Sequence, residues 1–256
     1  MNDSINWRNV WEDDSKAGIP DFKLDHAMDR RSAELESLSE QEHMDFIDPR
    51  EFEVVLDAGC GTGENIVRLH SRVRKIIGID YASGSIERCR KNLSEKQITN
   101  AELFTASLTD IPLPDWSVDR IICFSVLQYL NHEEVRRTLR EFVRVLNPGG
   151  TVILHVKNSS SLYWSALRAA KKLKTLLGGT SRTYNLRPYK WYMRELAALN
   201  FHILDYRGFN VFTLDGMPAV MTELLQKYEF RNYKHSFWRL PFVRCHGADL
   251  KIKAIL

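Results

Sequence analysis

Short apolar runs alternate with helical stretches along the middle of the chain. Runs rich in β-branched residues, which predict strands, cover residues 53–59, 75–80, 101–106, 118–125 and 151–157. Helical spacing is found near residues 63–72, 85–93 and 132–146, and the last of these stretches ends at Asn-Pro-Gly-Gly. Strands separated by helices in this way predict βαβ units with right-handed crossovers, and therefore a parallel sheet.

The C-terminal third of the chain is less regular. Residues 201–209 and 248–256 have the pattern of two further strands. The segment between them contains a predicted helix near residues 218–228. The predicted strands therefore number seven in all.

The chain divides into an N-terminal segment and one larger unit. We expect a charged helical segment over residues 1–50 and a domain over 51–256, with insertions at about 158–190 and 210–247. Trp7 and Trp11 are four residues apart and can share one helix face. Two interpretations of this segment stay open, because it can pack on the main domain or form a lid over an active site.

Composition narrows the class of protein. The chain has 256 residues, of which 44% are hydrophobic and 27% charged, which suits one globular domain with a sizeable core. There is no apolar run near 18 residues, and the first residues are polar and acidic, so we expect neither a transmembrane helix nor a signal peptide. The four cysteines are far apart and form no Cys-x-x-Cys pair, which predicts reduced thiols in a cytoplasmic protein and no metal site.

A glycine-rich turn follows the first predicted strand. Gly59, Gly61 and Gly63 allow positive φ and a close approach of a ligand to the main chain. Asp57 precedes them, so a pyrophosphate would meet a carboxylate there, whereas an ammonium group would be favoured. Asp80 ends the second strand and can accept both hydroxyls of a ribose. A ribose joined to a cationic amino acid describes S-adenosylmethionine better than NAD.

Four segments resemble the class I S-adenosylmethionine-dependent methyltransferase family, in the order and spacing of that family. They are VLDAGCGTGENIVRL at 55–69, IIGIDYASGSIERCRKN at 76–92, ASLTDIPLPDWSVDRIICFSVLQYL at 106–130 and EFVRVLNPGGTVILHV at 141–156. The resemblance implies a Rossmann-like α/β fold. Its sheet would have seven mostly parallel strands, helices on both faces and an antiparallel last strand.

The resemblance also implies positions for the cofactor. It places Asp57, Gly59, Cys60, Gly61 and Gly63 around the methionine and ribose end of S-adenosylmethionine. It assigns the ribose hydroxyls to Asp80 and gives Tyr81 a stacking role on the adenine, although Tyr81 can equally be a half-exposed residue at a helix entry.

The segment after the third strand departs from the family pattern. Members often carry an acid that accepts the adenine amino group, and Ser107 stands at that position, followed by Leu108. Asp110 is an alternative acceptor if the loop is shifted. After the fourth strand, Cys123 and Phe124 are expected to pass beside the methionine moiety.

The methyl acceptor is constrained mainly by exclusions. No [Asp/Asn]-Pro-Pro-aromatic stretch follows the fourth strand, which disfavours methylation of the exocyclic amines of DNA bases. No Pro-Cys dipeptide occurs, which disfavours a cysteine nucleophile acting on a pyrimidine ring. His155 and His132 are candidates for a catalytic base, needed only if the acceptor must lose a proton. Both have a structural alternative, His132 as a surface residue and His155 as a core residue.

Basic residues gather in the variable part of the chain, although the net charge is only +3. No Asp or Glu occurs between Glu141 and Glu195, whereas ten Lys and Arg residues do. Residues 161–177 read as a basic amphipathic helix ended by Gly178 and Gly179. It can be a surface helix that caps the domain, a helix that rests on an anionic membrane, or a basic wall for an anionic substrate.

The favoured function is O-methylation of a small-molecule, glycan or lipid-linked substrate. Residues 187–209 resemble a segment common in small-molecule methyltransferases, including ubiquinone-biosynthesis enzymes, so we do not expect a nucleic-acid partner. N- or C-methylation of a small molecule, or methylation of RNA, is the alternative reaction. A non-catalytic S-adenosylmethionine-binding module is the alternative of a different class.

Overall fold

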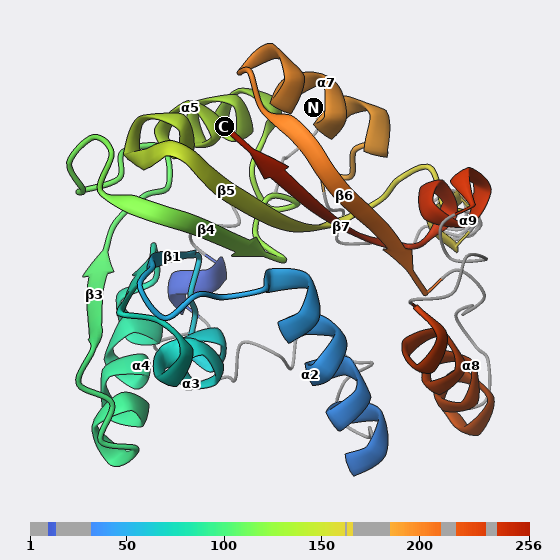
Figure 1. Ribbon diagram of the computed structural model, residues 1–256, viewed down its shortest axis with the longest axis horizontal. Helices are drawn as coiled ribbons and strands as arrows, with labels where there is room; N and C mark the ends of the chain where they lie inside the picture. The colour runs from blue at the N-terminus through green and yellow to red at the C-terminus, as the bar shows by residue number, and fades with distance from the viewer. Residues whose placement is uncertain (1–9, 14–31, 162, 166–184, 211–218, 234–239) are drawn as a thin grey trace.

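A single seven-stranded sheet organises the chain (Figure 1). The computed structural model describes residues 10–13, 32–161, 163–165, 185–210, 219–233 and 240–256. The strand order is β3-β2-β1-β4-β5-β7-β6. The strands are β1 (Val54–Ala58), β2 (Lys75–Asp80), β3 (Ala101–Thr105), β4 (Val118–Phe124), β5 (Leu146–Lys157), β6 (His202–Phe209) and β7 (Asp249–Ile255).

Neighbouring strands from β3 to β5 are parallel, and β7 is antiparallel to both β5 and β6. Because β7 is antiparallel, its first residue lies at the edge where the parallel strands end, and Asp249 pairs with Lys157 there. The predicted fold is therefore confirmed, including the antiparallel last strand.

Helices cover both faces of the sheet (Figure 1). One face carries α2 (Ala33–Ile47), α3 (Glu64–Leu69) with the 3₁₀ turn η2 (His70–Arg72), and α4 (Ser83–Glu95). The other carries α5 (His132–Val145) and α7 (Tyr189–Ala198). Near the start of β7 lie α8 (Ala219–Asn232) and α9 (Pro241–His246). Within the described residues, no helix has the length and apolarity needed to span a membrane.

Two apolar clusters, one on each face, form the core. The cluster on the α2 side contains Val55, Ile122 and Ile153. The cluster on the α5 side contains the residues next to them along the same strands, such as Leu56, Ile121 and Val152, because successive side chains of a strand point to opposite faces. Central strands covered on both faces bury every position, and all five residues of β1 are buried. This explains why the sequence shows continuous apolar runs there without polar alternation.

The helix α5 shows most directly how the sequence specifies an element. Asn131 caps it by accepting a hydrogen bond from the Glu134 amide, while the Glu134 carboxylate accepts one from the Asn131 amide. Its buried residues recur with helical spacing as Val135, Thr138, Leu139, Phe142 and Val145.

Buried ion pairs fasten α2 to the sheet. Arg120 of β4 donates to both carboxylate oxygens of Glu53, at 2.9 and 2.7 Å, and to the main-chain oxygen of Ile47. Glu42, fully buried on α2, is paired with Arg207 of β6 and Lys251 of β7. These contacts join residues far apart in the sequence, which is why local patterns did not reveal them.

Most element boundaries agree with the sequence prediction to within a few residues, and two differ visibly. The fifth strand begins at Leu146, before the Pro-Gly-Gly turn that was expected to precede it, because Leu146 already pairs with Val118. The first crossover helix ends at Leu69 and continues as a 3₁₀ turn. Apart from residues 161 and 163–165, the predicted basic helix at 161–177 lies outside the described residues, as does Trp7.

Candidate active site

The turn between β1 and α3 requires glycine for its own geometry. Gly59, Gly61 and Gly63 have φ values of 84°, 51° and 89°, in the left-handed region. A Cβ on Gly59 would lie 2.2 Å from a methyl carbon of Val126, and one on Gly63 would lie 2.5 Å from the sulfur of Cys89. Gly59 and Gly63 therefore also serve the packing of the turn against neighbouring side chains.

Asp57 lies directly before this turn and is fully buried. Its Oδ1 accepts a long hydrogen bond of 3.5 Å from the Asn65 side chain, and its Oδ2 has no hydrogen-bond partner within the described chain. Burial, with a smaller contribution from the nearby Asp80, raises the pKa of the Asp57 carboxyl to about 7, although the Asn65 hydrogen bond acts to lower it. A buried carboxylate in this state is stabilised by any cation that reaches it.

Asp80 ends β2 and is hydrogen-bonded to two main-chain amides. Its Oδ2 accepts from the Gly61 amide and its Oδ1 from the Ala82 amide, both at 2.9 Å. The carboxylate therefore joins the glycine turn to the entry of α4, and each oxygen retains further acceptor capacity. Tyr81, the next residue, is 46% exposed.

The remaining predicted cofactor residues lie along the same edge with different orientations. The Cys60 side chain is buried in the cluster with Ile66 and Cys89, so only its main chain faces the turn. Ser107 Oγ is hydrogen-bonded to Thr109 Oγ1 at 2.9 Å, and Leu108 is buried in the cluster of the opposite face.

Phe124, the last residue of β4, lies on the α2 side of the sheet. Its ring makes edge contacts with the His43 and His155 rings, at centroid distances of 4.7 and 6.1 Å. Ser125 follows with a φ of 58°, an uncommon value for a residue with a side chain. Its carbonyl accepts a hydrogen bond from the buried Gln128 side chain, and its amide donates to the His155 carbonyl.

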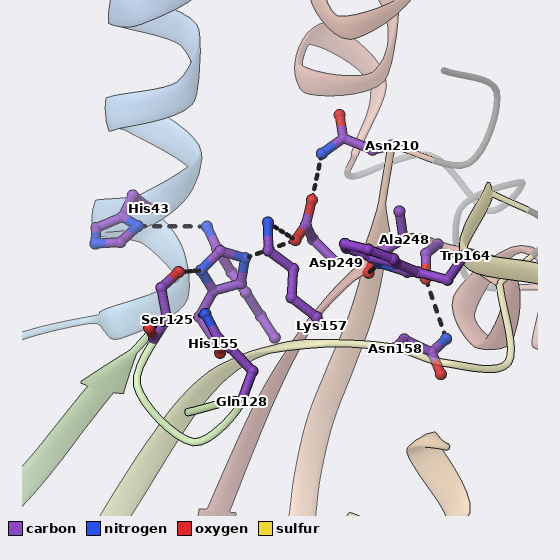
Figure 2. A network of polar contacts seen from close by, with 12 residues as sticks. His43, Ser125, Gln128, His155, Lys157, Asn158, Trp164, Asn210, Ala248 and Asp249 are labelled. Atoms are coloured by element: carbon purple, nitrogen blue, oxygen red, sulfur yellow. Dashed lines mark hydrogen bonds and ion pairs between the residues drawn. The ribbon is translucent and has the colours of Figure 1, made fainter. Parts of the chain in front are cut away.

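Polar side chains gather beyond the ends of β4 and β5 (Figure 2). Ser125 Oγ lies 3.3 Å from His155 Nδ1, and His155 Nε2 lies 3.7 Å from Asp249 Oδ1. Asp249 is also paired with Lys157 at 2.9 Å and accepts from Asn210 at 2.5 Å. Burial acts to raise the pKa of Asp249, but Lys157 and His155 outweigh it and hold that pKa at about 2.

Sequence reasoning found His155 in this group and missed its partners. Asp249, Lys251 and Lys253 occupy every second position of β7, so one face of this strand carries charged residues where a buried face would carry apolar ones. All three lie on the sheet face that α2 covers. That alternation of charges was the available signal, although it did not indicate which residue each would meet.

His132, the second candidate base, lies elsewhere. It begins α5, is exposed, and its ring packs edge-on against Trp191 of α7 at 5.2 Å. Partial burial lowers its pKa, and the charges of Arg187 and Arg136 lower it further. The structure therefore does not bring His132 and His155 together.

Residues 10–13 of the N-terminal segment lie against the same edge. The Trp11 ring packs edge-on against Tyr129 at 5.1 Å. Glu12 accepts hydrogen bonds from the Ser83 amide at 3.1 Å and the Ser83 hydroxyl at 2.8 Å. Since β1 lies between β2 and β4, these contacts reach the loops on both sides of the glycine turn. A lid role for residues 1–50 stays a prediction.

Comparison with known proteins identifies the central part of the chain. Residues 55–150 match the family model described as a methyltransferase domain. A malonyl-[acyl-carrier protein] O-methyltransferase of Yersinia pestis is 37% identical over 109 residues, which are 43% of this chain and 38% of that protein. A putative methyltransferase of Encephalitozoon cuniculi is 26% identical over 60% of this chain and 65% of its own length. The chain thus spans less than half the length of the first of these relatives.

Solved structures agree on the fold. A phosphoethanolamine N-methyltransferase of Haemonchus contortus superposes with a TM-score of 0.66 and 15% identity, over 97% of this chain and 47% of that one. A geranyl diphosphate C-methyltransferase of Streptomyces coelicolor gives a TM-score of 0.57 and 17% identity, over 86% and 79% of the two chains.

The seven-stranded topology, the glycine turn with its two aspartates and the match over residues 55–150 agree with one another. Residues 55–150 therefore form a methyltransferase domain, and this part of the chain is similar in sequence to S-adenosylmethionine-dependent methyltransferases.

Proposed function

We propose that this protein transfers the methyl group of S-adenosylmethionine to an oxygen of a small-molecule, glycan or lipid-linked acceptor. One observation carries the cofactor assignment: the fully buried Asp57 carboxylate, with one oxygen lacking a hydrogen-bond partner in the described residues, next to a turn of three glycines. The ammonium group of S-adenosylmethionine supplies the cation that this carboxylate lacks.

Different residues at this edge of the sheet bind different parts of S-adenosylmethionine. Asp57, with the main chain of Gly59, Cys60, Gly61 and Gly63, holds the methionine end. Asp80 takes the ribose hydroxyls with its remaining lone pairs.

The adenine lies farther along the same edge. Tyr81 stacks on it, while Ser107 and the main chain of Leu108 face its ring nitrogens. Phe124 bounds the site on the acceptor side. The cofactor supplies a methyl group already activated on a sulfonium, so the protein's task is to align the acceptor with it.

The printed activities of related proteins leave the acceptor atom open. The named relatives and structural neighbours are an O-, an N- and a C-methyltransferase. Transfer to oxygen is favoured here by the polar group around His155, which can receive a proton from a hydroxyl. N- or C-methylation is the alternative reaction.

Calorimetry and a transfer assay test this function. The wild-type protein should bind S-adenosylmethionine and move labelled methyl groups to an acceptor in cell extract. Asp57→Asn should weaken cofactor binding by about 2–3 kcal/mol, because an amide cannot neutralise the ammonium. Glu102→Gln is the control and should bind S-adenosylmethionine normally, because Glu102 of β3 is in an exposed ion pair with Lys75 of β2. Binding without transfer to any extract fraction would favour a non-catalytic module instead.

A lipid-linked acceptor is favoured by the outer face of α8. Val220, Met221, Leu224 and Tyr228 are 72%, 53%, 61% and 57% exposed and, at 100° per residue, gather on one side of the helix. Inward, α8 instead places polar Gln226 and the buried Glu229 against Asn210. An outward apolar stripe of this kind suits contact with a membrane surface.

Liposome flotation tests the membrane contact. Wild-type protein should float with vesicles that contain anionic lipid, and Leu224→Ser with Tyr228→Ser should reduce that fraction severalfold. Leu204→Ser is a matched control, since Leu204 is a similarly exposed residue of β6. Equal flotation of the α8 variant and the control would argue against the proposal.

A further inference from the structure

A continuous series of polar contacts joins the substrate-side insertion to the end of β4. It starts at Glu229 of α8, which accepts from the Asn210 amide at 2.8 Å. Asn210 then donates to Asp249 Oδ2, and Asp249 Oδ1 faces His155 Nε2. His155 Nδ1 faces Ser125 Oγ (Figure 2). The five residues come from the loop after β4, from β5 and β7, and from the insertion, and they are brought together only by the fold.

The series ends beside the glycine turn. Val126, the residue after Ser125, packs so closely on Gly59 that an added Cβ would be 2.2 Å from it. Ser125 itself is held in a left-handed conformation by the Gln128 side chain and by its amide bond to the His155 carbonyl. An uncommon backbone conformation that its surroundings hold in place is typical of a functional position.

The partners of His155 give its ring a direction. Asp249 is buried, paired with Lys157 and ionised, and its Oδ1 lies 3.7 Å from His155 Nε2, so its negative charge favours a proton on Nε2. The Nδ1 lone pair is then directed toward the Ser125 hydroxyl, which can donate to it. In this arrangement His155 is a proton acceptor on the side of the cofactor turn.

We propose that His155 takes a proton from a hydroxyl acceptor through Ser125, and that Asp249 and Asn210 are positioning residues that orient its imidazole for this step. The proposal rests on the methyltransferase function proposed above. It narrows the acceptor to an alcohol or phenol, because a carboxylate acceptor carries no proton at neutral pH and needs no base.

The acceptor oxygen attacks the methyl carbon of the sulfonium, an O–C bond forms, and the C–S bond breaks with its electron pair retained by sulfur. The acceptor's proton moves to Ser125 Oγ as the Ser125 proton moves to His155 Nδ1. The titratable groups that face His155 are Asp249, Lys251 across the β5–β7 pair and His43 of α2; Lys157 pairs with Asp249, and Glu42 of α2 pairs with Lys251 and with Arg207 of β6.

Nitrogen-15 NMR of the imidazoles tests the orientation without knowledge of the acceptor. With S-adenosylhomocysteine added, His155, assigned through His155→Gln, should show Nε2 protonated and Nδ1 unprotonated. Asp249→Asn and Asn210→Ala should change this tautomer ratio, and Asp249→Asn should lower the His155 pKa. Asp205→Asn is the matched control, since Asp205 is paired with Arg207 on the same sheet face, outside the series. A protonated Nδ1, or an unchanged spectrum in Asp249→Asn and Asn210→Ala, would overturn the proposal.

Methyl transfer from labelled S-adenosylmethionine to cell extract tests the chemistry. His155→Gln and Asp249→Asn should lower kcat on the order of 10²-fold, with unchanged affinity for S-adenosylhomocysteine. Ser125→Gly, which tolerates the left-handed backbone and removes the CH2OH side chain, should also lower it. The transferred label should resist mild alkali, as an ether does.

The outcomes separate the two proposals. Label released by alkali as methanol would indicate a methyl ester. An unaltered kcat in all three variants would indicate that His155 transfers no proton. Either result would overturn the hydroxyl step alone. No cofactor binding by the wild-type protein would overturn the methyltransferase function and this step with it. If Asp249→Asn fails to fold, Asn210→Ala and Ser125→Gly decide the result.

Discussion

The cofactor half of the sheet, β1 to β3, and the acceptor half, β5 to β7, each bury one aspartate at the edge where the parallel strands end. Among the described residues, Asp57 has only a long contact with Asn65, and its pKa is raised to about 7. Asp249 has Lys157, Asn210 and His155 around it, and its pKa is lowered to about 2. The first carboxylate needs a cation from a ligand, whereas the second receives its cation from the chain. A binding site and a self-contained polar network therefore differ in whether the protein supplies the counter-charge.

The largest expected effect concerns Asp57 and the free energy of unfolding. Its folded-state pKa lies above its usual value of 3.8, so as pH rises from about 4 to about 7 the unfolded chain loses a proton that the folded chain keeps. This costs the cofactor-free protein about 4 kcal/mol above pH 7. Asp57→Asn should remove that loss and raise the stability at pH 8, measured by urea unfolding. If the free energy of unfolding depended on pH equally in the variant and the wild type, the difference drawn between Asp57 and Asp249 would be contradicted.

Asp249 should show the opposite dependence with a smaller size. Its folded-state pKa lies below 3.8, so its stabilisation is present above about pH 4 and is lost as pH falls toward about 2. The expected loss is about 2 kcal/mol. Thermal unfolding between pH 2 and 5 measures it, with Asp205→Asn as the control. An acid profile of Asp249→Asn that matches the wild type would show that Lys157 does not stabilise the ionised form.

Substitution of Asp80 tests whether this residue of the cofactor half binds the ligand or only stabilises the fold. Asp80→Ala should weaken binding of S-adenosylmethionine by about 1–3 kcal/mol, through the lost ribose contacts and through loosening of the Gly61 and Ala82 amides. Asp80→Asn keeps one side-chain oxygen for the Gly61 or Ala82 amide, so it should lose less binding free energy than Asp80→Ala. Calorimetry decides, and unchanged affinity in both variants would exclude a ribose contact.

Removal of residues 1–30 should have the smallest effect. Trp11 and Glu12 contact the loops on both sides of the glycine turn, so their loss should weaken cofactor binding by about 1 kcal/mol and speed its dissociation. Stopped-flow dissociation measures the rate, and Glu12→Gln serves as the milder comparison. Unchanged binding and activity after the deletion would leave the segment with a packing role alone.

The sequence predicted the cofactor half well because its parts are close together along the chain. Asp57, the glycine turn and Asp80 lie within 24 residues, and each stands at the end of a buried strand whose apolar run is continuous. Their geometry follows from a strand, a turn and a helix in succession, so a local pattern contains most of the information. Their assignment to a ligand is still a prediction that the binding experiments test.

The acceptor half could not be predicted in the same way. His155 and Asp249 are 94 residues apart in the sequence, and they meet because β7 inserts antiparallel between β5 and β6. A shift of one residue in that register would turn Asp249 to the other face of the sheet. Asn210 reaches Asp249 because it directly follows Phe209, the residue of β6 that pairs with Asp249 of β7.

By itself, the sequence determined the α/β class, the seven strands and the glycine turn, because apolar periodicity and turn chemistry act over a few consecutive residues. Only the tertiary structure decided which charges face one another: Arg120 with Glu53, Glu42 with Lys251, and Asp249 with Lys157 and His155. The physical reason is that burial and electrostatic pairing depend on strand order and register, which arise from the packing of the whole chain.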